Sequence, residues 1–129
     1  MHVLNVKSAR RLLALVMLCA GLAACAKSPR DVYVETYRAL EQGKLDEAAG
    51  HFSEAAHAFL GSAKLRMVLA AQAEKIQECG GIRDLNVDLQ GEGDVRTGKS
   101  TITFKGDCAP VEENVRLVRE NDQWKIGLN

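Results

Sequence analysis

The four cysteines are the side chains of this 129-residue chain with the most versatile chemistry. A thiolate is a strong nucleophile that can be modified at sulfur, and two thiols can be oxidised to a disulfide. Cys19 and Cys25 lie within and directly after an apolar stretch, whereas Cys79 and Cys108 lie in the polar remainder of the chain. The two pairs therefore predict different chemistry.

The segment before Cys25 has the pattern of a secretory signal. Three basic residues at positions 7, 10 and 11 precede an apolar run of 13 residues, 12–24, and no acidic residue occurs before Asp31. This order is typical of the basic and apolar regions of a signal peptide. The run is shorter than the roughly 20 residues that cross a bilayer as a stable helix. We expect residues 1–24 to be a cleaved signal peptide.

The end of this run, residues 22–25 with the sequence Leu-Ala-Ala-Cys, resembles the lipobox of bacterial lipoproteins. In that family a diacylglyceryl group is attached to the cysteine sulfur, the chain is cleaved before the cysteine, and the new amino group is acylated. The resemblance implies lipidation of Cys25 and a short lipidated tether, 25–28. Several acyl chains hold a protein durably on a membrane. By the same resemblance, Ala26 directly after the cysteine favours a location of the protein at the outer membrane of the cell envelope, with its domain facing the periplasm.

Two other interpretations of the N-terminus stay open. One is an ordinary secretory signal with an incidental cysteine, and the other is a buried N-terminal helix of a cytosolic protein. Without residues 1–24 the chain keeps 14 basic and all 17 acidic residues, a net charge of −3. Since such a chain has no excess of positive charge to neutralise phosphates, no nucleic-acid partner is expected.

Cys79 and Cys108 remain as a pair once Cys19 leaves with the signal and Cys25 is lipidated. Outside the cytoplasm a remaining pair predicts a disulfide, here between the end of a helix and a loop between strands. The alternative is two free thiols. Neither cysteine forms a zinc-site spacing with His51 or His57, so no metal is expected.

Four further side chains could serve as an acid or a base in a catalytic cavity: His51, His57, Asp46 and Asp84. The two histidines lie six residues apart, on different faces of a helix. Asp46 suits the start of a helix, and Asp84 suits a solvated strand edge. No glycine-rich phosphate loop and no Gly-x-Ser-x-Gly elbow occurs in the sequence. We therefore expect a non-enzyme without catalytic residues or a cofactor.

The elements that position these side chains begin with a helix. Residues 28–29, Ser-Pro, suit the N-cap and the first helical position. Tyr33, Tyr37 and Leu40 recur at spacings of four and three, which predicts one apolar face. Gly43 is expected to follow the end of this helix.

Further helices are expected before the pattern changes to strands. The predicted segments are 44–52, a helix capped by Ser53, and about 63–78 after a break at Gly61 and Ser62. The inner stripe predicted for the last helix consists of Leu65, Val68, Leu69, Ala73 and Ile76.

Alternating apolar and polar residues predict strands in the second half of the chain. The expected strands are 85–89, 101–105, about 113–119, and a last strand with Trp124, Ile126 and Leu128 on one face. Glycine and polar clusters at 91–94, 106–110 and 121–123 predict the connections. Helices followed by consecutive antiparallel strands indicate an α+β architecture.

Residues 37–49 and 115–126, in this order of elements, resemble small bacterial lipoproteins of unknown function with a cystatin-like cone, the superfamily of nuclear transport factor two. The resemblance implies one domain, 29–129, with N-terminal helices packed on a curved antiparallel sheet of about four strands. The last hairpin departs from the usual Asp-Gly turn. Tyr37, Phe104 and Trp124 are candidates to line a cavity in the cone, although core packing is the commoner role of such aromatics.

Two alternatives to this prediction stay open. Residues 40–55 also resemble one tetratricopeptide unit, but such units need about three copies to be stable. For function, we expect a membrane-anchored, non-catalytic binding or interaction module that recognises a small apolar ligand or another envelope protein. A cone-fold isomerase or hydrolase is the alternative, and a carboxylate or histidine deep in the cone would favour it. The oligomeric state is not predicted.

Overall fold

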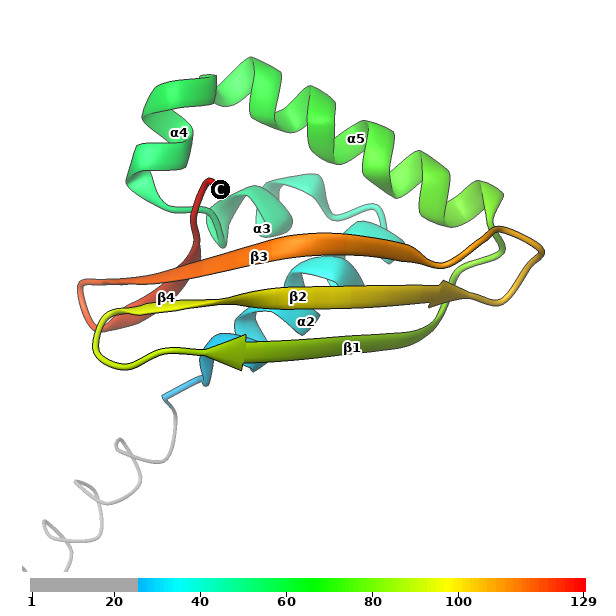
Figure 1. Ribbon diagram of the computed structural model, residues 1–129. Coiled ribbons are helices and arrows are strands. Elements are labelled where there is room, and N and C mark those ends of the chain that lie inside the picture. The colour runs from blue at the N-terminus through cyan, green and yellow to red at the C-terminus, as the bar shows by residue number, and fades with distance from the viewer. Residues whose placement is uncertain (1–25) are drawn as a thin grey trace, which may run out of the picture.

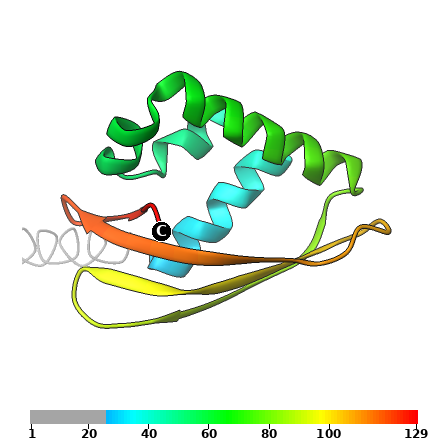
Figure 2. The same cartoon turned by 45° about the horizontal axis from the view of Figure 1, so that its top comes forward.

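A computed structural model describes residues 26–129, in which helices precede a single sheet. The elements are α2 (Pro29–Glu41), α3 (Leu45–Gly50), α4 (Glu54–Leu60), α5 (Ser62–Glu78), β1 (Ile82–Gln90), β2 (Val95–Phe104), β3 (Val111–Glu120) and β4 (Gln123–Ile126). The strands form an antiparallel sheet in the order β1-β2-β3-β4, which curls around α2 while α3, α4 and α5 cover its open side (Figures 1 and 2). The predicted α+β class with helices on a curved four-stranded sheet is confirmed.

Local signals set the helix boundaries. The Ser28 hydroxyl caps α2 by accepting a hydrogen bond from the Asp31 backbone N–H at 3.1 Å, and Pro29 occupies the first turn. Gly43 follows the helix with a φ of 73°, a conformation that costs glycine little. Ser53 caps α4 in the same way, through the Ala56 N–H.

The helix α3 ends at Gly50, two residues before the predicted position, because the next residues join the sheet edge. Phe52 forms a parallel bridge with Ile126 of β4. The Ser53 N–H donates to the Ile126 carbonyl at 2.9 Å, and the Ile126 N–H donates to the His51 carbonyl at 2.8 Å. These bonds satisfy backbone groups that a longer helix would have used.

The strand β2 begins at Val95, six residues before the predicted start. Its first half is polar, with a glycine at position 98, and has no alternating pattern of its own. It is a strand because it pairs on both sides: Thr97 lies opposite Gln90 of β1 and opposite Arg116 of β3. Backbone hydrogen bonds to two neighbours outweigh a weak local preference.

The last hairpin turns at Asn121 and Asp122, which have φ values of 49° and 62°. Glu120 pairs with Gln123, so the loop has two residues in the left-handed region, as in a type I′ turn. The strand β4 then ends at Ile126. Leu128 therefore lies beyond the sheet, 36% exposed, and not on the predicted inner face of a longer strand.

The core lies between α2, α5 and the concave face of the sheet. Its fully buried members include Leu40, Leu65, Leu69 and Leu117. Val68 was predicted in the inner stripe of α5 but is 43% exposed. Because α2 and α5 bury their apolar faces on a sheet, the chain is not a tetratricopeptide array. Within 26–129 no helix is long and apolar enough to span a bilayer.

Candidate functional site

One hollow of the domain lies between α5 and the concave face of the sheet. It has two adjoining chambers of about 400 and 500 Å³, which share Tyr37, Val68, Gln72 and Glu113 in their linings. The smaller chamber is walled by apolar side chains of α5 and of the sheet: Val68, Ala71, Ile76, Ile102, Phe104 and Val111. We call these two chambers the cone cavity.

A hydrogen-bonded polar cluster forms one wall of the cone cavity. The Tyr33 and Tyr37 hydroxyls both donate to Oε2 of Glu113, the first at 3.0 Å. The Gln72 side-chain N–H approaches Oε1 of the same carboxylate at 3.5 Å. Since the Tyr33 hydrogen points to Glu113, the Ser100 hydroxyl donates to the Tyr33 oxygen at 2.7 Å. We call these five residues the Glu113 cluster.

The regular elements bring this cluster together. Tyr33 and Tyr37 are one helical turn apart on α2, with ring centroids separated by 5.1 Å. Ser100 of β2 lies directly opposite Glu113 of β3 in the sheet register. Gln72 comes from α5, so the Glu113 carboxylate connects β3 with two helices, and Tyr33 extends the cluster to β2 through Ser100.

Burial keeps both phenols neutral. It raises the pKa of Tyr33 to about 12, and it also raises the pKa of Tyr37, with neighbouring Tyr33 and Glu113 adding to the effect. At neutral pH both hydroxyls are therefore hydrogen-bond donors. Within the described residues no buried side-chain nitrogen or oxygen lacks a partner. The cluster holds α2 on the sheet and presents carboxylate oxygens to an apolar hollow.

Raising the pH above 10 is expected to destabilise the fold. Tyr33 ionises near pH 10 when unfolded and near 12 when folded, so its contribution to stability is complete below pH 10. Between these values the unfolded chain loses a proton that the folded chain keeps, and the free energy of unfolding falls by up to about 1.4 kcal/mol per pH unit. Urea unfolding measured across this range checks the slope. In a Tyr33→Phe variant the free energy of unfolding should fall less steeply with pH. An equal slope in the variant and the wild-type protein would contradict the role of Tyr33.

His51 lies outside the cone cavity, at the end of α3. The Thr36 hydroxyl donates to the Val32 carbonyl at 2.8 Å, so it accepts from the Nδ1–H of His51 at 2.7 Å. Burial lowers the pKa of His51. This histidine links α3 to α2 in its neutral form.

Acidification is expected to destabilise the fold, because it places a charge on the partly buried His51 ring. Because the folded pKa of His51 lies below the unfolded value of 6.5, its contribution to stability is complete above pH 6.5. Below that pH the unfolded chain binds the proton first, and the free energy of unfolding falls. An NMR titration should show His51 ionising below pH 6.5, and a His51→Gln variant should lose part of the acid dependence of unfolding. Ionisation of His51 above 6.5 would contradict the prediction.

The other three titratable candidates do not line the cone cavity either. His57 lies in α4, and its Nε2–H donates to the Ala49 carbonyl at 2.9 Å. Asp46, in the first turn of α3, forms an exposed ion pair with Arg66 at 2.7 Å. Asp84 lies on the edge strand β1 with a side chain that is 70% exposed. The structure therefore brings none of these candidates together.

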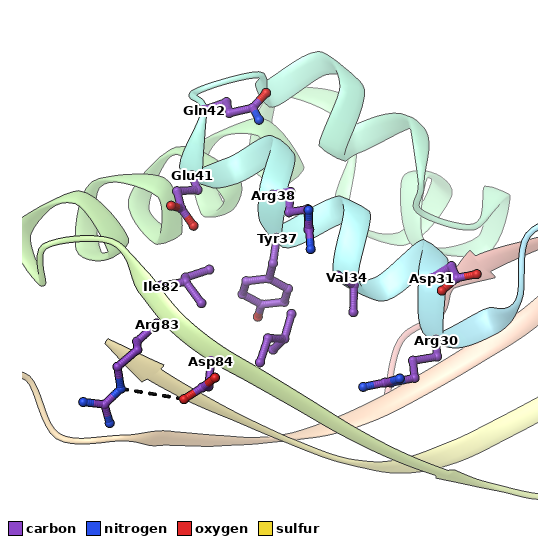
Figure 3. A pocket seen from close by; sticks show the side chains of 11 residues that line it. Arg30, Asp31, Val34, Tyr37, Arg38, Glu41, Gln42, Ile82, Arg83 and Asp84 are labelled. Carbon is purple, nitrogen blue, oxygen red and sulfur yellow. Dashed lines mark ion pairs between the residues drawn. The ribbon is translucent and has the colours of Figure 1, made fainter. Parts of the chain in front are cut away.

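A second hollow, a groove of about 610 Å³, lies between α2 and the edge strand β1 (Figure 3). Arg30, Arg38 and Arg83 line it, but so do three carboxylates, one of which, Asp84, pairs with Arg83 at 3.7 Å. Because charges of both signs alternate around this groove, it favours neither an anionic nor a cationic ligand.

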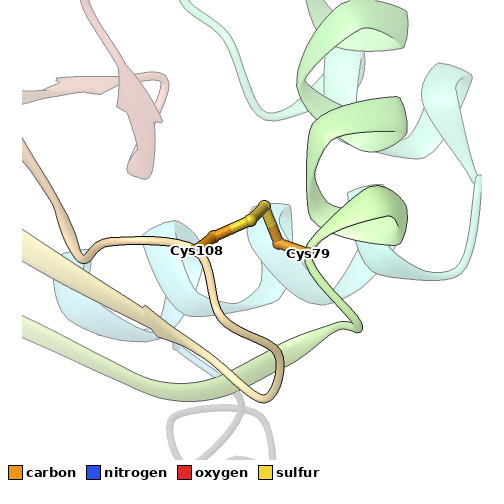
Figure 4. The surroundings of a disulfide bond; sticks show 2 residues. All are labelled: Cys79 and Cys108. Atoms are coloured by element: carbon orange, nitrogen blue, oxygen red, sulfur yellow. A yellow bond between two sulfur atoms is a disulfide. The ribbon is translucent and has the colours of Figure 1, made fainter.

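The disulfide closes one end of the domain, where it joins Cys79 after α5 to Cys108 in the loop between β2 and β3 (Figure 4). The Cα atoms are 5.5 Å apart. Next to it the Gly106 N–H donates to the Cys79 carbonyl at 2.8 Å. The predicted connection between a helix end and a strand loop is present.

Sequence patterns located part of the cone cavity. Tyr37 and Phe104 line it as predicted, whereas Trp124 instead stacks against Arg96, whose guanidinium lies 5.1 Å from the ring centroid. Glu113 was not predicted as a site residue from the sequence. It lies two residues before Val115, so the two side chains share the inner face of β3. That spacing would have identified a carboxylate on the buried face.

The predicted signal peptide and the lipidation of Cys25 lie outside the described residues. Among residues 26–129, no group of three histidine, cysteine, aspartate or glutamate side chains is placed to hold a metal ion.

Helices closing over a curled antiparallel sheet with a hollow between them define a cone-shaped domain. No known family model matches the sequence, and no curated protein matches it. The fold is similar to that of a solved structure from Campylobacter jejuni, named as a candidate NTF2-like transpeptidase, with a TM-score of 0.67 and 21% identity. The match covers 80% of this chain and 100% of that one. The chain thus has an NTF2-like cone fold, and at this identity the similarity concerns the fold alone.

Proposed function

We propose that this chain is a membrane-anchored lipoprotein of the bacterial cell envelope whose cone domain is a non-catalytic binding module. The anchor is the lipid on Cys25, and the outer membrane facing the periplasm is the proposed location. The cone cavity is the binding site, and its occupant is a small, largely apolar molecule. The observation that carries the proposal is a hollow with a largely apolar lining and the hydrogen-bonded Glu113 cluster in one wall, with Lys75 and Arg116 among its other lining residues. Such a mixture is usual for a ligand site.

The Glu113 cluster supports binding over catalysis. Oε2 of Glu113 accepts from two phenols, which fix the carboxylate between α2 and β3 and give this oxygen a structural role. Neither histidine of the described residues lines the cone cavity to relay a proton. The more weakly engaged Oε1, with Gln72 at 3.5 Å, is the atom available to a donor group on a ligand.

A cone-fold hydrolase or isomerase is the second candidate. The specific observation in its favour is the Glu113 carboxylate itself, an ionisable group beside a cavity. Turnover of the extracted ligand by the wild-type protein, lost in Glu113→Gln, would support this candidate against the first. A ligand that the wild-type protein releases unchanged supports the binding module.

The cavity is tested by native mass spectrometry of the protein extracted from its own membranes. The wild-type protein should carry a bound small molecule. Val68 lines both chambers, so Val68→Trp should lose the bound molecule, whereas Met67→Trp should keep it because Met67 does not line them and is 66% exposed. Equal retention by the two variants, or no adduct on the wild-type protein, would overturn the cavity as the binding site.

The anchor is tested separately. The mass of the mature N-terminus should correspond to acylated Cys25, and Cys25→Ser should abolish acylation and release the domain from the membrane fraction. A Cys25→Ser protein that still fractionates with membranes would contradict lipid anchoring, whatever the cavity binds.

A further inference from the structure

A run of nine residues that includes all of α4 after its first residue contains no charged side chain. Residues 55–63 contain no aspartate, glutamate, lysine or arginine. The only ionisable side chain in this run, His57, is hydrogen-bonded to the Ala49 carbonyl. Phe59, in the last turn of α4, is 79% exposed, and Ala55, Ala58 and Ala63 are exposed as well. We call 55–63 the α4 surface.

The α4 surface lies in the half of the domain where the chain enters. In both views α4 and the first turn of α2 lie in the half of the domain away from the disulfide (Figures 1 and 2). In Figure 1, α4 lies above the strands and the first turn of α2 lies near their lower edge. The Glu54 N–H at the start of α4 donates to the Glu120 side chain, which fixes α4 against the turn between β3 and β4 at that end.

The tether to the proposed anchor is short. Only three residues separate Cys25 from Pro29, and an extended chain of this length reaches about 14 Å. Part of it is engaged already, because Lys27 pairs with Glu35 of α2 at 2.8 Å and Ser28 caps the helix. A lipid on Cys25 would therefore hold the first turn of α2 close to the headgroups.

We infer that the α4 surface lies against the lipid bilayer, with the Phe59 ring in the interfacial region, so that the domain stands on the membrane by its α4 end. The inference rests on the proposed lipid anchor and adds an orientation to it. Aromatic rings are favoured at the membrane interface, and an uncharged surface has no ionic side chain to dehydrate there. Glu54 directly precedes the uncharged run and Lys64 directly follows it, so the run is flanked by one charge of each sign.

The full-length acylated protein in vesicles of phosphatidylethanolamine and phosphatidylglycerol tests this orientation. Phe59→Cys introduces a thiol that carries a fluorophore, since Cys79 and Cys108 are bonded to each other and Cys25 is acylated. The matched control is Glu74→Cys, exposed near the other end of the same helical layer. With spin-labelled lipids in the bilayer, emission from position 59 should fall at least about twofold, and emission from position 74 should stay unchanged.

Three results would overturn the inference. The first is that the label at position 59 is not quenched although mass spectrometry shows that the protein is acylated. This result would refute the orientation but not the lipid anchor. Positions 59 and 74 could be quenched equally, which refutes standing on the α4 end. Native mass spectrometry could show position 59 covered by a second copy or by another protein. Protein without acyl chains would instead refute the proposed anchor, and the orientation with it.

Discussion

Replacing Cys79 and Cys108 together by serine is expected to lower the free energy of unfolding by about 3 to 4 kcal/mol. The two cysteines are 29 positions apart in the sequence, and the segment between them includes β1 and β2, so loss of the disulfide restores considerable conformational freedom to the unfolded chain. This would be a large share of the stability of a domain of this size. Urea unfolding of the double variant and of the wild-type protein measures the difference.

The reduced wild-type protein is the control for this prediction. It should unfold at the same urea concentration as the double serine variant, because both lack only the covalent bond. The Gly106–Cys79 backbone hydrogen bond remains in both, so the fold should persist. A loss below about 1 kcal/mol would contradict the proposed role of the bond in stability.

Replacing Glu113 by leucine is expected to lower the free energy of unfolding by about 2 to 4 kcal/mol. The variant removes the acceptor of two phenols, Tyr33 and Tyr37, that are only 4% and 6% exposed. Leaving a buried donor without a partner costs about 1 to 3 kcal/mol for each group. The measurement is again urea unfolding, at neutral pH where both phenols are protonated.

The variant Glu113→Leu/Tyr33→Phe/Tyr37→Phe separates this cause from a packing defect. When the two phenol donors are removed together with their acceptor, neither donor is left buried without a hydrogen-bond partner. The triple variant should therefore be more stable than Glu113→Leu alone. A triple variant that loses the sum of the separate effects would show that the Glu113 cluster acts through packing. Glu113→Gln should cost less than Glu113→Leu, since the amide oxygen still accepts a hydrogen bond.

The Glu113 cluster thus has a structural role that is independent of any ligand. A carboxylate that connects α2 and α5 with β3 also lines the cone cavity. For this reason binding should be compared between Glu113→Gln and the wild-type protein only at pH values and temperatures where both are fully folded.

Local signals in the sequence determined most of the helical boundaries and the class of fold. Ser28 and Ser53 cap helices through their own hydroxyls, and Gly43 and Gly61 adopt positive φ values after helices. These effects act over four residues or fewer, so they can be read without knowing the tertiary structure. The alternation of apolar residues in 85–89 likewise predicted β1.

The pairing of Cys79 with Cys108 could be predicted by counting cysteines, because only these two remain in the part of the chain after Cys25. The signal peptide and the lipid anchor are predictions from a pattern of charge and hydrophobicity, and they stay predictions.

Tertiary structure alone decided the elements whose partners are distant in sequence. The polar first half of β2 is a strand because β1 and β3 both pair with it, and α3 stops at Gly50 because Phe52 meets Ile126. Tyr33 and Glu113 are 80 residues apart, and only the curl of the sheet around α2 brings them into hydrogen-bond distance. A short-range pattern can identify which face of a strand is buried, but it carries no information on which helix will lie over that face.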